Sequence, residues 1–178
     1  ELDPSNALFR GLYAVVLVYG RRYDDALAEA EAALAIQGDI APARAARRRV
    51  YGIRGMREEQ LAEQREQISY DPGRLAAFDR GLAEGGYEGA QRAIADLLTR
   101  RFEKASGEPN TGTLRVFMPC AIANRYFDAQ DDDRALDWLE KAYDVRDPNL
   151  PSEIAMPSWD PLRAHPRFQA LARRLGLP

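Results

Sequence analysis

The sequence predicts an all-α fold, a right-handed α-α superhelix of about four helix pairs closed by a C-terminal capping segment. Three helix-breaking signals carry this prediction, at Pro4, Gly38 and Pro72, and successive signals lie 34 residues apart. Each interval has room for two helices and a turn. A single helix pair cannot bury its apolar side, so neighbouring pairs are expected to stack on one another.

Composition excludes several kinds of chemistry. The 178-residue chain has a net charge of -3, a sequence pI near 5.3, one histidine (His165) and one cysteine (Cys120). These residues allow no two-histidine metal site and no internal disulfide within one chain. We therefore expect no cofactor and no metal, and the acidic balance argues against a nucleic-acid partner through this region.

The longest apolar run, residues 7–19, is shorter than the ~20 residues that a membrane span needs, so no membrane contact is expected. We expect a cytoplasmic location, or a periplasmic one if the full protein carries a transmembrane helix upstream. The sequence starts at Glu1 rather than at a methionine. Residues 1–6 are therefore interpreted as the tail of a truncated upstream repeat.

The first predicted unit covers residues 7–40. Residues 7–19 predict an apolar helix, and Gly20 suits the C-terminus of that helix. Residues 23–37 predict a second helix that is rich in alanine, the strongest helix former. Its small residues recur at spacings of four and three, which places them on one face and lets two helices approach closely. They are Ala26, Ala30 and Ala33.

This second helix carries a family resemblance. The segment from Tyr23 to Ala30, followed by Ala33, resembles the second helix of a tetratricopeptide (TPR) repeat, whose period is 34 residues. In this resemblance Ala26 is the residue that packs against the first helix. The resemblance implies a module that binds other proteins and is not itself an enzyme.

The second unit, residues 41–74, follows at the same spacing. Gly55 lies at the expected turn between its two helices, and Pro72 closes the unit. Gln60 takes the position that Ala26 has in the first unit.

The third and fourth units are predicted over about residues 75–105 and over residues 114–145. The third is less regular, with a short helix from Phe78 to Glu84, a turn at Gly85-Gly86 and a long helix from Tyr87 to Ala105. The fourth consists of helices over 114–130 and 131–145. In its second helix, Ala135, Leu139 and Ala142 repeat the spacing of the small residues in the first unit.

Residues 146–178 predict an irregular, proline-containing segment followed by capping helices. Asp160 is expected to cap a short helix, and Pro166 to open a last helix that runs through Leu175. This tail resembles the C-terminal end of bacterial multidomain regulators, in which TPR repeats follow a winged-helix regulator, an adenylate cyclase or a protein kinase. The matching segments are Asp160–Arg163, Pro166–Phe168 and Gly176–Pro178.

The resemblance also implies a binding groove on the concave side, lined by the first helix of each unit. We expect a protein or peptide partner there, with a homodimer as a further prediction. Chaperone-binding TPR groups clamp a terminal carboxylate with lysines and asparagines. Among the groove residues of this chain only Asn124 matches that pattern, so a carboxylate clamp is not expected. The alternatives are an apolar ligand segment, self-association or cover by upstream repeats. The predicted groove residues are Leu8, Leu12, Val15, Tyr19, Arg49, Ile53, Phe117, Asn124 and Phe127.

Other functions remain open at this point. One alternative is a helical small-molecule sensor or enzyme with a pocket between the groove and residues 146–158, and another is an architectural spacer. The arginines between Arg44 and Arg57 could bind phosphate, but nearby glutamates, Glu63 among them, favour an ordinary solvated helix face. Asp131 and the two aspartates after it are typical of a helix N-terminus.

Overall fold

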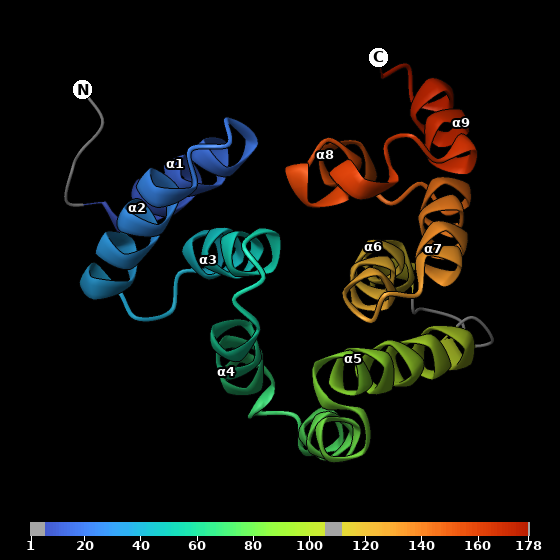
Figure 1. Ribbon diagram of the computed structural model, residues 1–178, viewed down its shortest axis with the longest axis horizontal. Helices are drawn as coiled ribbons and strands as arrows, with labels where there is room; N and C mark the ends of the chain where they lie inside the picture. The colour runs from blue at the N-terminus through green and yellow to red at the C-terminus, as the bar shows by residue number, and fades with distance from the viewer. Residues whose placement is uncertain (1–5, 106–111, 178) are drawn as a thin grey trace. The chain divides into compact units, whose positions relative to one another are not determined.

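The computed structural model describes residues 6–105 and 112–177, with the side chains of 112–118 outside the description (Figure 1). Within these residues the protein is all-helical and contains no β-strand, which confirms the predicted class. The elements are α1 Ala7–Tyr19, α2 Tyr23–Ile36, α3 Ala41–Ile53, α4 Arg57–Ile68, α5 Pro72–Ala105, α6 Gly112–Asp128, α7 Asp132–Asp144, α8 Leu150–Ile154, the 3-10 helix η1 Pro157–Leu162 and α9 Pro166–Arg174.

The chain divides into two compact units. The first unit consists of Glu1–Gln67 together with Met156–Asp160, and the second of Ile68–Ala155 together with Pro161–Pro178. No helix in the described part of the chain has both the length and the apolar character needed to cross a membrane.

The helices within a pair are joined by a recurring turn. After α1, Arg21 adopts a left-handed backbone with φ of 58°, its N–H donates to the carbonyl of Val18, and the next N–H donates to Leu17. This is the Schellman arrangement, which satisfies carbonyl groups that the end of a helix leaves free. The same two bonds and a positive φ recur at Gly55, between α3 and α4, and at Gln130, between α6 and α7.

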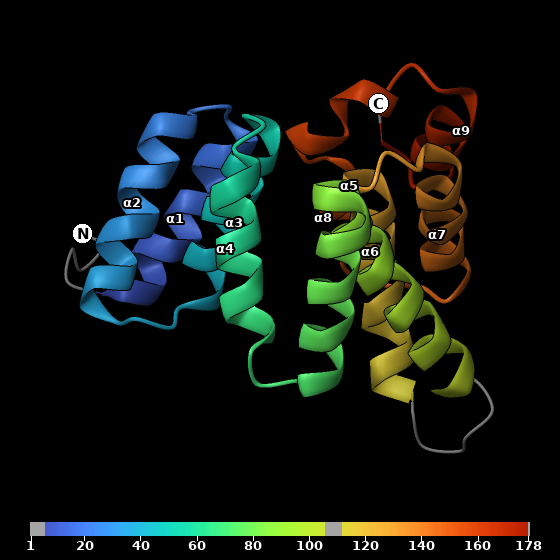
Figure 2. The same ribbon diagram turned by 60° about the horizontal axis from the view of Figure 1, so that its bottom comes forward.

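In the first unit, α1 packs against α2 and α3, and α2 also packs against α3 (Figures 1 and 2). The alanines predicted to line α2 are buried, with Ala26 at 0% exposure. Gly11 marks the closest approach of α1 and α3, because a Cβ at this position would lie 3.0 Å from the backbone nitrogen of Ala43. Small residues thus let the three helices come together.

An ion pair inside each helix pair repeats at the predicted spacing. Arg10 of α1 contacts Glu29 of α2 at 2.8 Å, and 34 positions later Arg44 of α3 contacts Glu63 of α4 at 3.1 Å. The bounds of α1 equal the predicted helix over 7–19, and α2 ends one residue before the predicted Gln37. The two helix pairs of this unit therefore share their register, their turns and one ion pair.

In the second unit, α5 is bent at Gly85 and Gly86, as the paired glycines predict, and Gly86 has a φ of 60°. The part before the bend starts at Pro72, earlier than the predicted Phe78. The reason is a cap, because the N–H of Arg74 donates to Asp71 Oδ1 at 3.0 Å while proline occupies the first helical position.

The C-terminal part corrects two predictions. Residues 146–158 are not irregular throughout, since they contain α8 and the start of η1. Asp160 does not cap a helix but lies inside η1, where its carboxylate contacts Arg21 at 2.5 Å within the first unit. The last helix does start at Pro166, and its cap is His165, whose Nδ1 accepts from the N–H of Arg167 at 3.3 Å.

Candidate protein-interaction surface

Helix α1 is apolar on nearly all sides, which is the property of a helix buried all round. One side is buried by α2 and α3 through Ala7, Gly11, Ala14, Leu17 and Val18. The opposite side exposes large apolar side chains, each between 42% and 60% exposed. They are Leu8, Phe9, Leu12, Tyr13 and Val16.

The exposed side of α1 consists of two neighbouring strips. Successive residues in an α-helix are turned by about 100° about its axis. Leu8, Val15 and Tyr19 therefore share one line, which we call the groove strip. Phe9 and Val16 share a second line, which we call the end face. Leu12 lies at the border between the two.

Helix α3 continues the groove strip. Arg49 and Ile53 lie 34 positions after Val15 and Tyr19, and all four side chains are half-buried. Because α1 and α3 pack side by side, these residues of consecutive first helices lie on the same side of the unit. Six of the predicted groove residues are thus brought onto two adjacent helices.

The end face has a different counterpart in α3. Each of the three residues that lie 34 positions after Phe9, Leu12 and Val16 is 0% exposed. The first of them lies against Gly11 of α1, so this line of α3 faces the preceding helix pair. The same line of α1 has no helix of the described chain packed on it and is exposed. The three counterparts are Ala43, Ala46 and Val50.

Other predicted groove residues lie elsewhere. Asn124 and Phe127 lie on α6 in the second unit, and the Asn124 amide donates to the carbonyl of Cys120 at 2.9 Å within its own helix. Phe117 falls outside the described side chains. Gly11 and Val18 of α1 are buried against neighbouring helices.

Sequence reasoning missed Phe9, Tyr13 and Val16. The signal that could have found them is the apolar character of residues 7–19 on every side, because a helix flanked only by α2 and α3 cannot bury its whole circumference. The groove residues implied by the TPR resemblance include the groove strip but leave out Phe9 and Val16 of the end face.

The arginine cluster on α3 serves as an internal ionic network. The carboxylate of Glu63, whose side chain is only 2% exposed, contacts both Arg44 and Arg47, and Glu66 contacts Arg44 at 2.9 Å. Hydrogen bonding to Glu66 raises the pKa of Arg44 above its ordinary value, and the same contact lowers the pKa of Glu66 below its ordinary value. These arginines bind carboxylates of α4, so they form neither a free phosphate site nor a merely solvated face.

The described part of the second unit includes a larger and a smaller hollow. The larger, about 540 Å³, is open to solvent and lies beside the start of the predicted pocket segment. Its polar groups hold the fold together, since Asp147 accepts from the N–H groups of Cys120 and Asn149, and Arg174 lies 3.9 Å from the centre of the Tyr143 ring. It is lined by Ala142, Tyr143, Asp144, Arg146, Asp147, Pro148, Leu150, Pro151 and Leu175.

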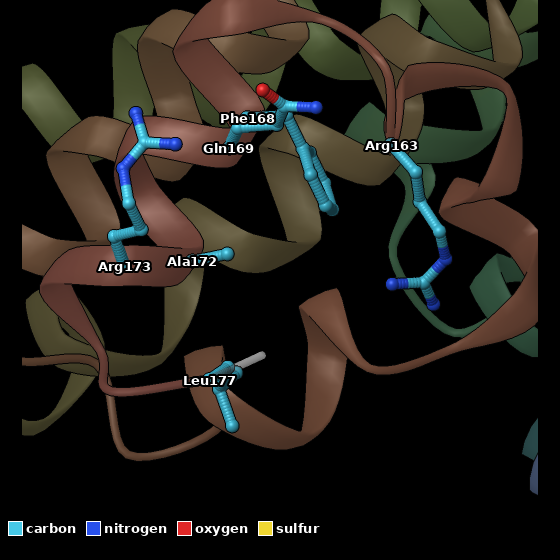
Figure 3. A pocket seen from close by; sticks show the side chains of 6 residues that line it. All are labelled: Arg163, Phe168, Gln169, Ala172, Arg173 and Leu177. Atoms are coloured by element: carbon cyan, nitrogen blue, oxygen red, sulfur yellow. The ribbon is translucent and has the colours of Figure 1, made fainter.

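The smaller hollow, about 360 Å³, lies beside α9 (Figure 3). The apolar side chains of Phe168 and Leu177 line it, and Arg163 and Arg173 lie on opposite sides of Phe168 in this view. Both arginines are exposed, and Arg163 donates to the carbonyl of Ala155 at 3.2 Å. The two cations therefore do not converge on one point of the hollow.

Groups of three or more His, Cys, Asp or Glu side chains suited to a metal are absent from the described residues. Cys120 is buried, and His165 serves as a helix cap.

The fold and this surface define an all-helical protein that contains stacked helix pairs and a two-strip apolar surface on α1. No protein-family model, curated protein or solved structure matches the chain.

Proposed function

We propose that the chain is a TPR-like protein-interaction module that binds an apolar protein or peptide segment along the groove strip. The observation that carries the proposal is the line of Leu8, Val15 and Tyr19 on α1, continued by Arg49 and Ile53 on α3. In this proposal the role of the chain is binding rather than catalysis.

The repeated geometry of the first unit supports a TPR-like stack. The ion pair of Arg10 with Glu29 recurs 34 positions later, and so does the turn with a left-handed residue. In the second unit, α6 and α7 are joined by the same turn at Gln130, and Ala135 is buried as Ala26 is. We extend this pattern to about four helix pairs that form a right-handed superhelix.

The chemistry of the groove strip supports an apolar ligand. Burying apolar surface contributes about 25 cal/mol per Å², so a strip of half-exposed aliphatic and aromatic side chains favours a partner that covers it. Arg49 is the charged residue of the strip. In the bacterial regulators that the tail resembles, such a surface would belong to the C-terminal part of a larger signalling protein.

A peptide selection tests the proposal. A library of short random peptides is panned against the immobilised chain, with the Val15→Glu variant as the counter-selection. We expect enriched peptides that are rich in apolar residues and whose affinity falls at least about tenfold on Val15→Glu, because a charge then faces the apolar ligand. The control is Tyr70→Glu, a matched change at a residue that is 77% exposed and lies outside the strip.

Circular dichroism of each variant establishes that its helices are intact. The proposal fails if no peptide is enriched, or if the enriched peptides bind wild type and Val15→Glu equally well.

A further inference from the structure

Arg125 of α6 is a charged residue that the proposed function does not use. It lies in the second unit, where α6 packs against α5. Its side chain is only 15% exposed. Its Nη1 donates to Gln91 Oε1 of α5 at 3.0 Å, and Gln91 is itself 0% exposed. A largely buried cation is thus hydrogen-bonded to a neutral amide.

The positive charge of Arg125 has a distant counterion. Among the described residues its one carboxylate contact is with Asp128, three residues further along α6, at 3.7 Å. This separation is longer than a hydrogen bond. Burying a charge without a close partner costs free energy. Accordingly, burial lowers the pKa of Arg125 below its ordinary value.

Arg44 of the first unit offers a matched comparison, because its side chain is also 15% exposed. It contacts the carboxylates of Asp39, Glu63 and Glu66 at 3.1, 3.1 and 2.9 Å. Hydrogen bonding to these glutamates raises its pKa. Two arginines of equal exposure therefore differ in one respect, since the chain neutralises Arg44 closely and Arg125 does not.

A second cation adds to the positive charge near Arg125. The charge of Arg74, close to the start of α5, lowers the pKa of Arg125 further. The Nε of Arg74 is buried and lies 3.4 Å from Asp71, a carboxylate that also accepts from Arg101 at 2.6 and 3.1 Å. Two like charges that repel each other are stabilised by an anion that contacts both.

The unused donors of Arg125 fit such an anion. A guanidinium carries five N–H donors, and the contacts of Arg125 with Gln91 and Asp128 both use Nη1. Its planar fork binds two oxygens of a carboxylate or phosphate through parallel hydrogen bonds. We propose that Arg125 and Arg74 form a binding site for an oxyanion, the carboxylate or phosphate group of a ligand. This site lies outside the groove strip and goes beyond the proposed function.

Thermal unfolding of the full chain tests the site at constant ionic strength, with sodium chloride replaced stepwise by sodium acetate or sodium phosphate. An anion that binds only the folded chain raises the melting temperature, by about 2–4 °C at about ten times its Kd. We expect such a rise in wild type and not in Arg125→Gln. A rise with acetate assigns a carboxylate ligand, and a rise with phosphate alone assigns a phosphorylated one.

Two further variants make the comparison specific. Arg100→Gln, a matched change at an exposed arginine of α5, should keep the full rise, which also accounts for the general stabilisation that phosphate gives to folded proteins. Arg74→Gln should reduce the rise by at least about half, because one of the two cations is lost. Arg74 is 28% exposed, so this variant decides the test if circular dichroism shows that Arg125→Gln has lost its helices.

A rise of equal size in wild type and in the Arg125→Gln and Arg74→Gln variants would overturn the inference, as would no rise with either anion up to about 100 mM. An arginine that only holds α5 and α6 together gives the first of these results, with a lower melting temperature of Arg125→Gln in chloride. Failure here leaves the proposed function standing, because the groove strip lies on other helices and is tested by peptide binding.

Discussion

At the scale of single residues, glycines and alanines decide how closely the helices of the first unit approach. Gly11 has no space for a side chain on the side of α3, where the backbone of Ala43 lies 3.0 Å from the position of an added Cβ. Backbone atoms cannot move aside as the end of a flexible side chain can. The close contact between α1 and α3 therefore depends on the absence of a side chain at Gly11.

Gly11→Ala should lower the free energy of unfolding by about 1–3 kcal/mol, because one methyl group overpacks the α1–α3 contact. Chemical denaturation at pH 7 measures the change. The matched control is Gly38→Ala, since an added Cβ at Gly38 meets nothing within 4 Å and leaves the stability unchanged or slightly higher. Equal effects of the two substitutions would show that Gly11 does not close this contact.

At the scale of elements, the start of α5 is fixed by one carboxylate. Asp71 accepts from the N–H of Arg74 at 3.0 Å and from both guanidinium nitrogens of Arg101, at 2.6 and 3.1 Å. The contact with Arg101, aided by the N–H of Arg74, holds the pKa of Asp71 well below its usual value. Asp71 thus ties the first part of α5 to the part after the bend at Gly85 and Gly86.

The lowered pKa of Asp71 predicts a pH dependence. A carboxylate with a lower pKa in the folded state contributes stability above its unfolded pKa, about 4, and loses it as pH falls towards the folded value. Asp71→Asn should therefore be less stable than wild type at pH 7, and the gap should shrink as pH drops below about 4. Thermal unfolding at pH 7 and pH 3 measures it, with Asp133→Asn on the exposed start of α7 as the control. A gap that is independent of pH would contradict this role.

How well the bounds of a helix could be predicted depends on whether the residues that set them are close in sequence. The bounds of α1 follow from residues close in sequence, namely Gly20 at its end and the apolar run before it. The early start of α5 could be inferred only weakly, because Asp71 caps the helix with the help of Arg101, thirty residues later. Asp160 was wrongly expected to cap a helix, since its contact with Arg21 joins residues 139 positions apart.

Part of the candidate surface could also be predicted, because the positions of some of its residues follow from sequence spacing alone. The family resemblance selected Val15 and Tyr19 by position, and both are partly exposed on α1. The end face could not be selected this way, because whether Phe9 and Val16 are covered depends on what packs against α1. That property belongs to the tertiary structure and not to the spacing of residues.

At the scale of the whole molecule, one helix carries two exposed apolar strips, the groove strip and the end face of α1. In the proposed function the groove strip binds an apolar segment, and the end face lies on another side of the same helix. Val15 and Val16 are neighbours in sequence but differ in direction by about 100°, so one belongs to each surface. They offer the same side chain in two environments.

The most direct test compares the affinities of Val15→Glu and Val16→Glu for a peptide selected on the wild-type chain. We expect Val15→Glu to weaken peptide binding at least about tenfold, whereas Val16→Glu on the end face leaves peptide binding intact. Equal losses of affinity from both substitutions, or no loss from either, would contradict binding along the groove strip.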